Sequence, residues 1–139
     1  IIFIIQEYMD PFKPSFEYRW NYYGVYSTEL SSELEIGQFF NILKETSSIE
    51  HGYRSYAIEV VDETDATSLV EDEKLISLVN FLYEKEPRLL EVLSSIIFFR
   101  KQGCSAEEER AKLDALKGHL SSFFEDAYAS LEKVEEITN

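Results

Sequence analysis

Hydrophobic and polar positions alternate strictly over residues 16–22, and this period of two predicts a half-buried strand. The aromatic positions share one face, which is expected to lie against the core. Gly24 is expected to end the strand, and Ser27 then has the position and chemistry of a helix N-cap. The apolar spacing that follows predicts a helix over 28–43, with a bend or a break at Gly37, where the apolar stripe changes face.

The next segment, 46–61, has the composition of a β-hairpin. A short strand is predicted at Ile49–Glu50, a turn at His51–Gly52 and a return strand over 53–61. Because a helix followed by a hairpin is the outline of a winged helix, residues 1–61 are predicted to form a winged-helix-like part.

An acidic stretch at 62–72 separates this part from the rest and is interpreted as a linker. Beyond it the apolar period becomes helical, and a lobe of four helices is predicted over 73–139. The second of these helices, over 87–102, is apolar around most of its circumference and is expected to lie centrally. The spacing of serine and glutamate predicts capping boxes at two helix starts, Ser105 with Glu108 and Ser122 with Glu125.

These elements predict an α+β, mostly α fold in which residues 1–139 form a single compact domain. A chain of 139 residues is suited to one domain of roughly 100–150 residues. The apolar segment Ile1–Ile5 is interpreted as the buried end of an element that begins before this chain.

The net negative charge of the chain indicates which classes of binding partner are expected. The chain has 27 acidic and 13 basic side chains and a formal charge of −14 at pH 7. Such a charge disfavours anionic membranes and nucleic acids, although it does not exclude nucleic acid. A basic protein is the expected partner, and a homodimer is left open. One cysteine and the lack of an apolar run near the roughly 18–20 residues that cross a bilayer indicate a cytoplasmic protein.

Residues that carry chemistry are sparse. His51 and His119 are the only histidines, and neither has the spacing of metal ligands. Cys104 follows a predicted helix C-terminus, where the dipole disfavours a thiolate, so a buried and inert thiol is expected. The acids at 107–109 open a helix and are interpreted as complementing its dipole. No catalytic residue, metal site or cofactor is therefore predicted, and the chain is expected not to be an enzyme.

The candidate binding residues are surface charges. Glu29 and Glu33 lie in the first part of the predicted helix 28–43, and they are the candidates for contacting a basic protein. In the alternative, the chain is a transcription regulator that binds DNA through its winged helix. Arg54, at the hairpin, is then the residue expected to contact the nucleic acid.

The run from Phe16 to Leu30, FEYRWNYYGVYSTEL, carries a family resemblance. It is similar to the F-x-Y-x-x-Y-G-P-Y-S-x-x-L pattern of the YwgA-like proteins of bacteria and archaea, with Val25 where that pattern has proline. Residues 89–99 and the Gly103-Cys104-Ser105 turn also resemble that family's late helical pattern. The resemblance implies a mostly helical domain with a small hairpin. Through the more distant SocA-type (Panacea) domains, it implies an antitoxin-like or adaptor-like interaction module.

Overall fold

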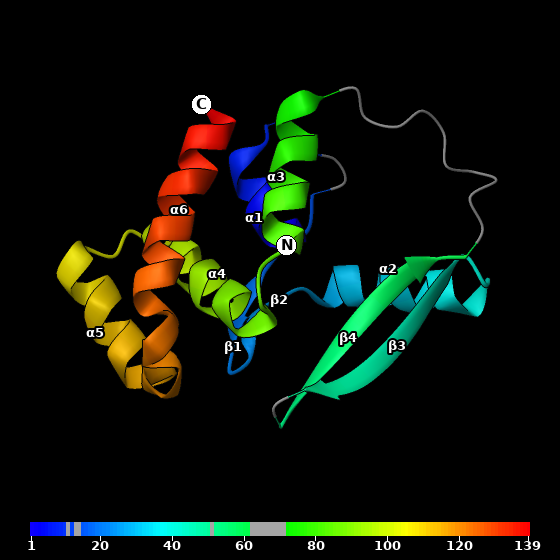
Figure 1. Ribbon diagram of the computed structural model, residues 1–139, viewed down its shortest axis with the longest axis horizontal. Coiled ribbons are helices and arrows are strands. Elements are labelled where there is room, and N and C mark those ends of the chain that lie inside the picture. Colours follow the sequence, from blue (N-terminus) through cyan, green and yellow to red (C-terminus); the bar gives the residue numbers. More distant parts are fainter. Residues whose placement is uncertain (11, 13–14, 51, 62–71) are drawn as a thin grey trace. The chain divides into compact units, whose positions relative to one another are not determined.

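The chain is mostly helical with two small β-hairpins, which confirms the α+β, mostly α class predicted from the sequence (Figure 1). The computed structural model describes residues 1–10, 12, 15–50, 52–61 and 72–139. The predicted linker therefore lies outside the described residues except at its last position, Asp72.

The chain divides into two compact units. Unit 1 comprises Ile1–Tyr26 together with Glu71–Asn139, and unit 2 comprises Ser27–Val70. The sequence predicts that the first 26 residues belong with the second hairpin in one part, 1–61, whereas the structure places them with the C-terminal helices. The first helix buries the apolar side chains of Phe3 and Ile4 in the core of unit 1, and this burial holds the segment there.

One helix organises unit 1. The helices of this unit are α1 Ile2–Tyr8, α3 Glu73–Tyr83, α4 Pro87–Lys101, α5 Ala106–Lys117, the 3₁₀-helix η1 Gly118–Phe123 and α6 Phe124–Thr138. Helix α4 contacts α1, α5, η1 and α6. Its buried residues run from Leu89 to Phe99 and include consecutive positions, so it is enclosed on several sides. The prediction that this helix lies centrally is confirmed.

Helix starts in unit 1 follow largely from capping chemistry. Asp72 accepts hydrogen bonds from two backbone N–H groups at the start of α3, and Pro87 occupies the first turn of α4. The capping box that opens α5 is confirmed. Ser105 accepts from the N–H of Glu108 at 3.2 Å, and the Glu108 carboxylate accepts from the N–H of Ser105 at 2.8 Å.

The second predicted capping box, Ser122 with Glu125, is wrong. The chain passes through this segment as η1, and α6 begins at Phe124 with no side-chain cap. Leu120 and Phe124 are both buried here. Burying each is worth about 2–3 kcal/mol, which outweighs a cap worth about 1 kcal/mol.

The first hairpin belongs to unit 1. Strands β1 Arg19–Asn21 and β2 Gly24–Tyr26 pair antiparallel, so the strand predicted over 16–22 is shorter than expected. Gly24 begins the second strand instead of ending the first, which corrects the prediction. Its φ is +113°, and a Cβ there would lie 3.2 Å from Cγ of Glu91. The turn therefore needs glycine.

The aromatic positions of this hairpin have different environments. Tyr18 and Trp20 pack against the core of unit 1, as predicted. Tyr22 does not, because it lies in the turn after β1 and is 59% exposed. The expectation that all the alternating aromatic residues face the core is wrong at this position.

Unit 2 begins with helix α2 Thr28–Phe39. The predicted N-cap is confirmed, because Oγ of Ser27 accepts from the N–H of Leu30 at 3.2 Å. A break of the helix at Gly37, the second form of the predicted irregularity, is wrong, since α2 runs through this residue, and a bend there stays a prediction. The glycine instead allows a close approach, because a Cβ there would lie 2.7 Å from Cδ1 of Leu43.

Helix α2 is also shorter than the predicted 28–43. The chain leaves the helix through Asn41, which has a positive φ of 55°, and enters a strand at Leu43. Asparagine tolerates this left-handed conformation better than most residues.

The second hairpin consists of β3 Leu43–Glu50 and β4 Tyr53–Val60, paired antiparallel with Leu43 opposite Val60. The predicted return strand is confirmed to within one residue. The first strand is far longer than the predicted Ile49–Glu50, because five polar residues at 44–48 mask its apolar alternation. The predicted turn residue His51 lies outside the described residues. Helix and hairpin follow in the predicted order, and winged-helix character beyond that order stays a prediction.

A buried carboxylate links three helices of unit 1. Glu109 on α5 is 3% exposed, accepts from Nε of Arg100 on α4 at 2.9 Å, and accepts from the Tyr128 hydroxyl on α6 at 2.9 Å. Glu109 lies in the first turn of α5, as the interpretation of these acids as a complement to the helix dipole requires, and it also has these partners. Its bonds tie α5 to both of its neighbours.

The pKa of Tyr128 is raised to about 12, first by burial and then by its hydrogen bond to Glu109 and the charge of that carboxylate. An unfolded tyrosine has a pKa near 10, so the unfolded chain loses this proton first. We therefore expect the contribution of Tyr128 to the free energy of unfolding to persist up to about pH 10 and to be lost as the pH rises toward 12. Titration of Cζ-labelled tyrosine by NMR tests this, with Tyr128→Phe assigning the resonance. A midpoint near pH 10 contradicts it.

Candidate functional site

The second hairpin has one apolar face. Residues that are cross-strand partners place their side chains on the same side of a sheet. The register therefore groups eight side chains on what we call the apolar hairpin face: Leu43, Glu45, Ser47, Ile49, Arg54, Tyr56, Ile58 and Val60. The other face is polar and carries Lys44, Thr46, Ser48, Ser55, Ala57 and Glu59. The hairpin is thus amphipathic, a pattern that normally indicates burial of one side.

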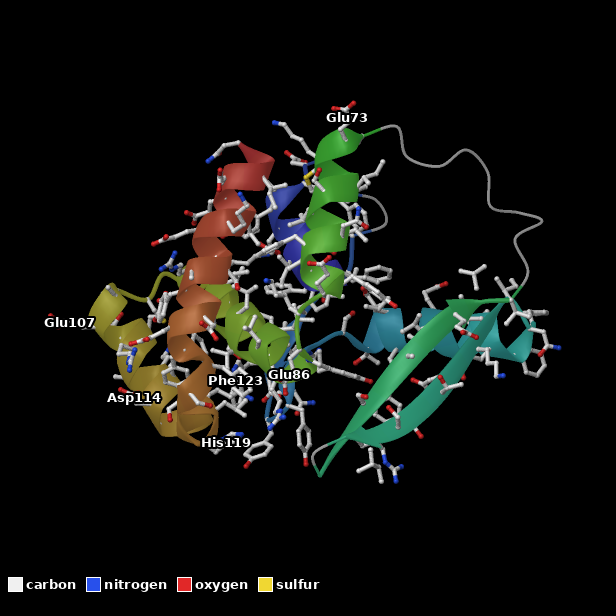
Figure 2. The ribbon with its side chains drawn as sticks, in the orientation of Figure 1. Glu73, Glu86, Glu107, Asp114, His119 and Phe123 are labelled. Atoms are coloured by element: carbon white, nitrogen blue, oxygen red, sulfur yellow. The ribbon has the colours of Figure 1, made fainter. Side chains whose placement is uncertain are left out.

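Most of the apolar hairpin face is exposed instead, whereas Leu43 at its end is half-buried beside α2. The exposed fractions are 69% for Ile49, 61% for Tyr56, 45% for Ile58 and 56% for Val60. Side chains project from both sides of β3 and β4 in Figure 2. Among the described residues of unit 2, no hydrophobic side chain is buried. Exposed apolar patches of this kind mark sites of interaction with other proteins.

Helix α2 adds a second exposed apolar feature beside the predicted binding acids. Glu29, Glu33, Ile36 and Phe40 are spaced so that they fall on one side of the helix and its C-terminal end. Ile36 is 50% exposed, Phe40 is 65% exposed, and both acids are exposed. The structure therefore places Glu33 one turn from Ile36, and Glu29 one turn further toward the N-terminal end of the same side of α2.

Arg54, the residue proposed for the DNA-binding alternative, is exposed near the start of β4. It is the single cation among the eight side chains of the apolar hairpin face and lies opposite Ile49. Residues 27–61 contain six carboxylates and two cationic side chains, a net charge of −4. Arg54 therefore lies in an acidic unit, which repels a phosphate backbone.

Unit 1 contains a cluster that the sequence did not reveal. Lys117, at the end of α5, is completely buried, and its Nζ lies 2.5 Å from Oε1 of Glu91 on α4. The same ammonium donates to the backbone carbonyl of Tyr22 and lies 5.1 Å from the ring centre of Trp20. This lysine anchors the turn of the first hairpin. No sequence signal marks it, because its partners lie 26 and 95 positions away.

His119 and Cys104 are the described histidine and cysteine, and each has its own surroundings. His119 stacks on the Tyr22 ring with the ring centres 6.1 Å apart, and it lies at one end of the helices in Figure 2. Cys104 is half-buried rather than buried, and its Sγ lies 3.1 Å from Nζ of Lys112. In the described ranges, no group of three or more His, Cys, Asp or Glu residues could hold a metal ion.

Unit 1 also has a hollow of about 440 Å³ against α1 and the C-terminal end of α4. Its walls include the aromatic rings of Phe3, Tyr18 and Phe98. Lys101 lies at its edge, with Nζ 2.5 Å from Oε1 of Glu7. None of the lining residues is a serine, threonine, cysteine or histidine. The lining therefore contains no hydroxyl or thiol nucleophile of these types and no histidine base.

As far as the structure describes the chain, it has no helix with the length and hydrophobicity to cross a membrane.

The fold and this surface define a small, acidic α+β chain with an amphipathic hairpin and a helix that carries exposed apolar side chains. The chain is 24% identical over 141 residues to the uncharacterized protein YwgA of Bacillus subtilis (strain 168), and the match covers 99% of this chain and 82% of that protein. This supports the resemblance to YwgA-like proteins and does not extend to SocA-type domains. No protein-family model and no solved structure matches the chain.

The buried Lys117–Glu91 pair makes a stability prediction. Lys117→Ala leaves the Glu91 carboxylate enclosed without its partner, so we expect the free energy of unfolding to fall by about 3–5 kcal/mol. The double change of Lys117→Met with Glu91→Leu removes both charges and should cost much less. Urea denaturation followed by far-ultraviolet circular dichroism measures all three proteins.

The matched control is Lys133→Ala. Lys133 forms an exposed ion pair with Glu136, and its loss should change the free energy of unfolding by less than about 1 kcal/mol. Equal effects of the Lys117→Ala and Lys133→Ala changes would show that the enclosed pair contributes no more than a surface one.

Proposed function

We propose that the chain is a non-enzymatic protein-interaction module, antitoxin-like or adaptor-like, and that unit 2 binds a basic protein. The observation that carries this proposal is the exposed apolar hairpin face, on which Tyr56 and Ile58 are 61% and 45% exposed. Tyrosine is among the residues that contribute most binding energy at protein interfaces. An amphipathic hairpin with an uncovered apolar side is suited to a partner that covers it.

Charge specifies the kind of partner. Residues 27–61 have a net charge of −4, and Glu29 and Glu33 lie beside the exposed Ile36 and Phe40 on α2. An apolar patch bordered by acids matches a partner that carries apolar and basic side chains together. A second copy of this chain brings the same negative charge, so a homodimer through this surface is opposed by repulsion.

The antitoxin or adaptor role comes from the family resemblance alone. The name of the B. subtilis relative assigns it no activity. Both roles require binding to a partner through an exposed surface. The surface of unit 2 supports this shared requirement.

The DNA-binding alternative is less well supported. A DNA reader usually presents several cations to the phosphate backbone, whereas the apolar hairpin face offers Arg54 alone. The exposed residues of α2 include Glu29, Glu33 and Glu35, which repel phosphate.

The proposal predicts which changes release the partner. The tagged full chain captures its partner from nuclease-treated host lysate, and the purified partner is then titrated against variants by surface plasmon resonance. We expect Tyr56→Ser with Ile58→Thr to weaken binding by about 10- to 100-fold, because interface anchors contribute about 2 kcal/mol or more. The pair Glu29→Lys with Glu33→Lys should weaken binding and reduce its dependence on salt.

The control for the hairpin variant is Thr46→Ser with Ala57→Ser, on the opposite face of the same hairpin. It should bind like the unchanged chain. A captured protein that binds all variants equally contradicts the proposed surface. If a parallel capture from lysate without nuclease recovers nucleic acid alone, and Arg54→Ala loses it, the DNA-binding alternative is supported instead.

A further inference from the structure

We propose that the partner binds unit 2 as an extended basic strand, which pairs with the outer edge of β4 and extends the hairpin to three strands. This inference rests on the proposed function and specifies the form in which the partner binds. In the described part of the chain, β3 and β4 make a sheet of two strands, so the outer edge of β4 has no strand beside it.

The hydrogen-bond pattern shows which residues present that edge. The N–H of Val61 donates to the carbonyl of Ile42, so these two residues form a hydrogen-bonded pair. In an antiparallel ladder, hydrogen-bonded and non-hydrogen-bonded pairs alternate. The pairs that follow, beginning with Leu43 opposite Val60 and continuing at every second position, are therefore non-hydrogen-bonded. The backbone N–H and C=O groups of Tyr56, Ile58 and Val60 consequently point away from β3, toward the open edge.

In the described part of the chain, this edge has few of the protections that usually prevent strand addition. Proteins protect exposed edges with proline, bulges, charged side chains or short strands. Strand β4 has eight residues in unbroken register, contains no proline, and has only Glu59 as a charged residue after Arg54. Strand β3, by comparison, carries adjacent charges at Lys44 and Glu45, and contacts α2. The open edge of β4 is therefore the better template.

The side chains define the chemistry of the added strand. A residue that pairs directly with Ile58 places its side chain on the apolar hairpin face, beside Tyr56 and Val60. Its two neighbours point to the polar face, where Glu59 is exposed. The matching segment therefore alternates β-branched apolar residues with lysine or arginine. This is strand addition, in which backbone bonds provide affinity and alternate side chains provide specificity.

The test uses a fluorescein-labelled synthetic peptide, Lys-Val-Lys-Ile-Lys-Val-Lys, titrated with the full chain by fluorescence anisotropy. Two modified peptides carry N-methyl groups on the apolar residues or on the internal lysines. In an antiparallel addition the apolar residues direct their N–H groups at β4, because they pair with Tyr56, Ile58 and Val60. We expect methylation of the apolar residues to weaken binding at least tenfold and methylation of the lysines to leave it nearly unchanged. The reverse result also supports strand addition, with the peptide running parallel.

The outcomes separate this inference from the proposed function. If both methylations weaken binding equally, or if neither does, the strand addition is overturned while a basic partner still binds. If the unmodified peptide does not bind, or binds no better than a version with glutamate in place of lysine, the preference for a basic partner fails as well. The Tyr56→Ser, Ile58→Thr chain should bind the peptide at least tenfold more weakly, and the Thr46→Ser, Ala57→Ser chain should bind it normally. Circular dichroism of both variants checks that they remain folded.

Discussion

The enclosure of helix α4 is the interaction on which the rest of unit 1 depends. Its buried residues, from Leu89 to Phe99, meet apolar side chains of α1, α5, η1 and α6. Because these contacts bury apolar surface on several sides, the neighbouring helices and the first hairpin share one core. Within this apolar setting, charged side chains persist only where they are paired, as Lys117 is with Glu91 and Glu109 is with Arg100.

Unit 2 shows what happens without such a core. Its helix and hairpin are held by backbone hydrogen bonds and by the close approach of Leu43 to Gly37, and its described apolar side chains are not buried. A helix and a two-stranded hairpin are marginal as isolated units. The exposed apolar residues of unit 2 are therefore available for binding, and a partner that covers them would also supply the burial that this unit lacks.

The proposed binding surface could be predicted from the sequence in part. The charge of Glu29 and Glu33 indicates them as candidates, and helical spacing alone places them on the same side of α2 as Ile36. The alternation of Tyr56, Ile58 and Val60 was visible as well, but its face became known only from the pairing with β3. The register decides which residues share a face, and polar residues at 44–48 concealed the strand that sets it.

The sequence by itself determined the elements whose signals are local. Helical period, glycine and proline positions, and caps such as Ser27 and Ser105 predicted most helices and the hairpin, because each signal acts within a few residues. Tertiary structure alone decided what depends on distant partners. The first 26 residues joined the C-terminal helices, η1 replaced a capped helix start, and Lys117 became enclosed. The physical reason is the same in each case. Burial depends on contacts between surfaces that are distant in the sequence, and a local sequence pattern does not specify those contacts.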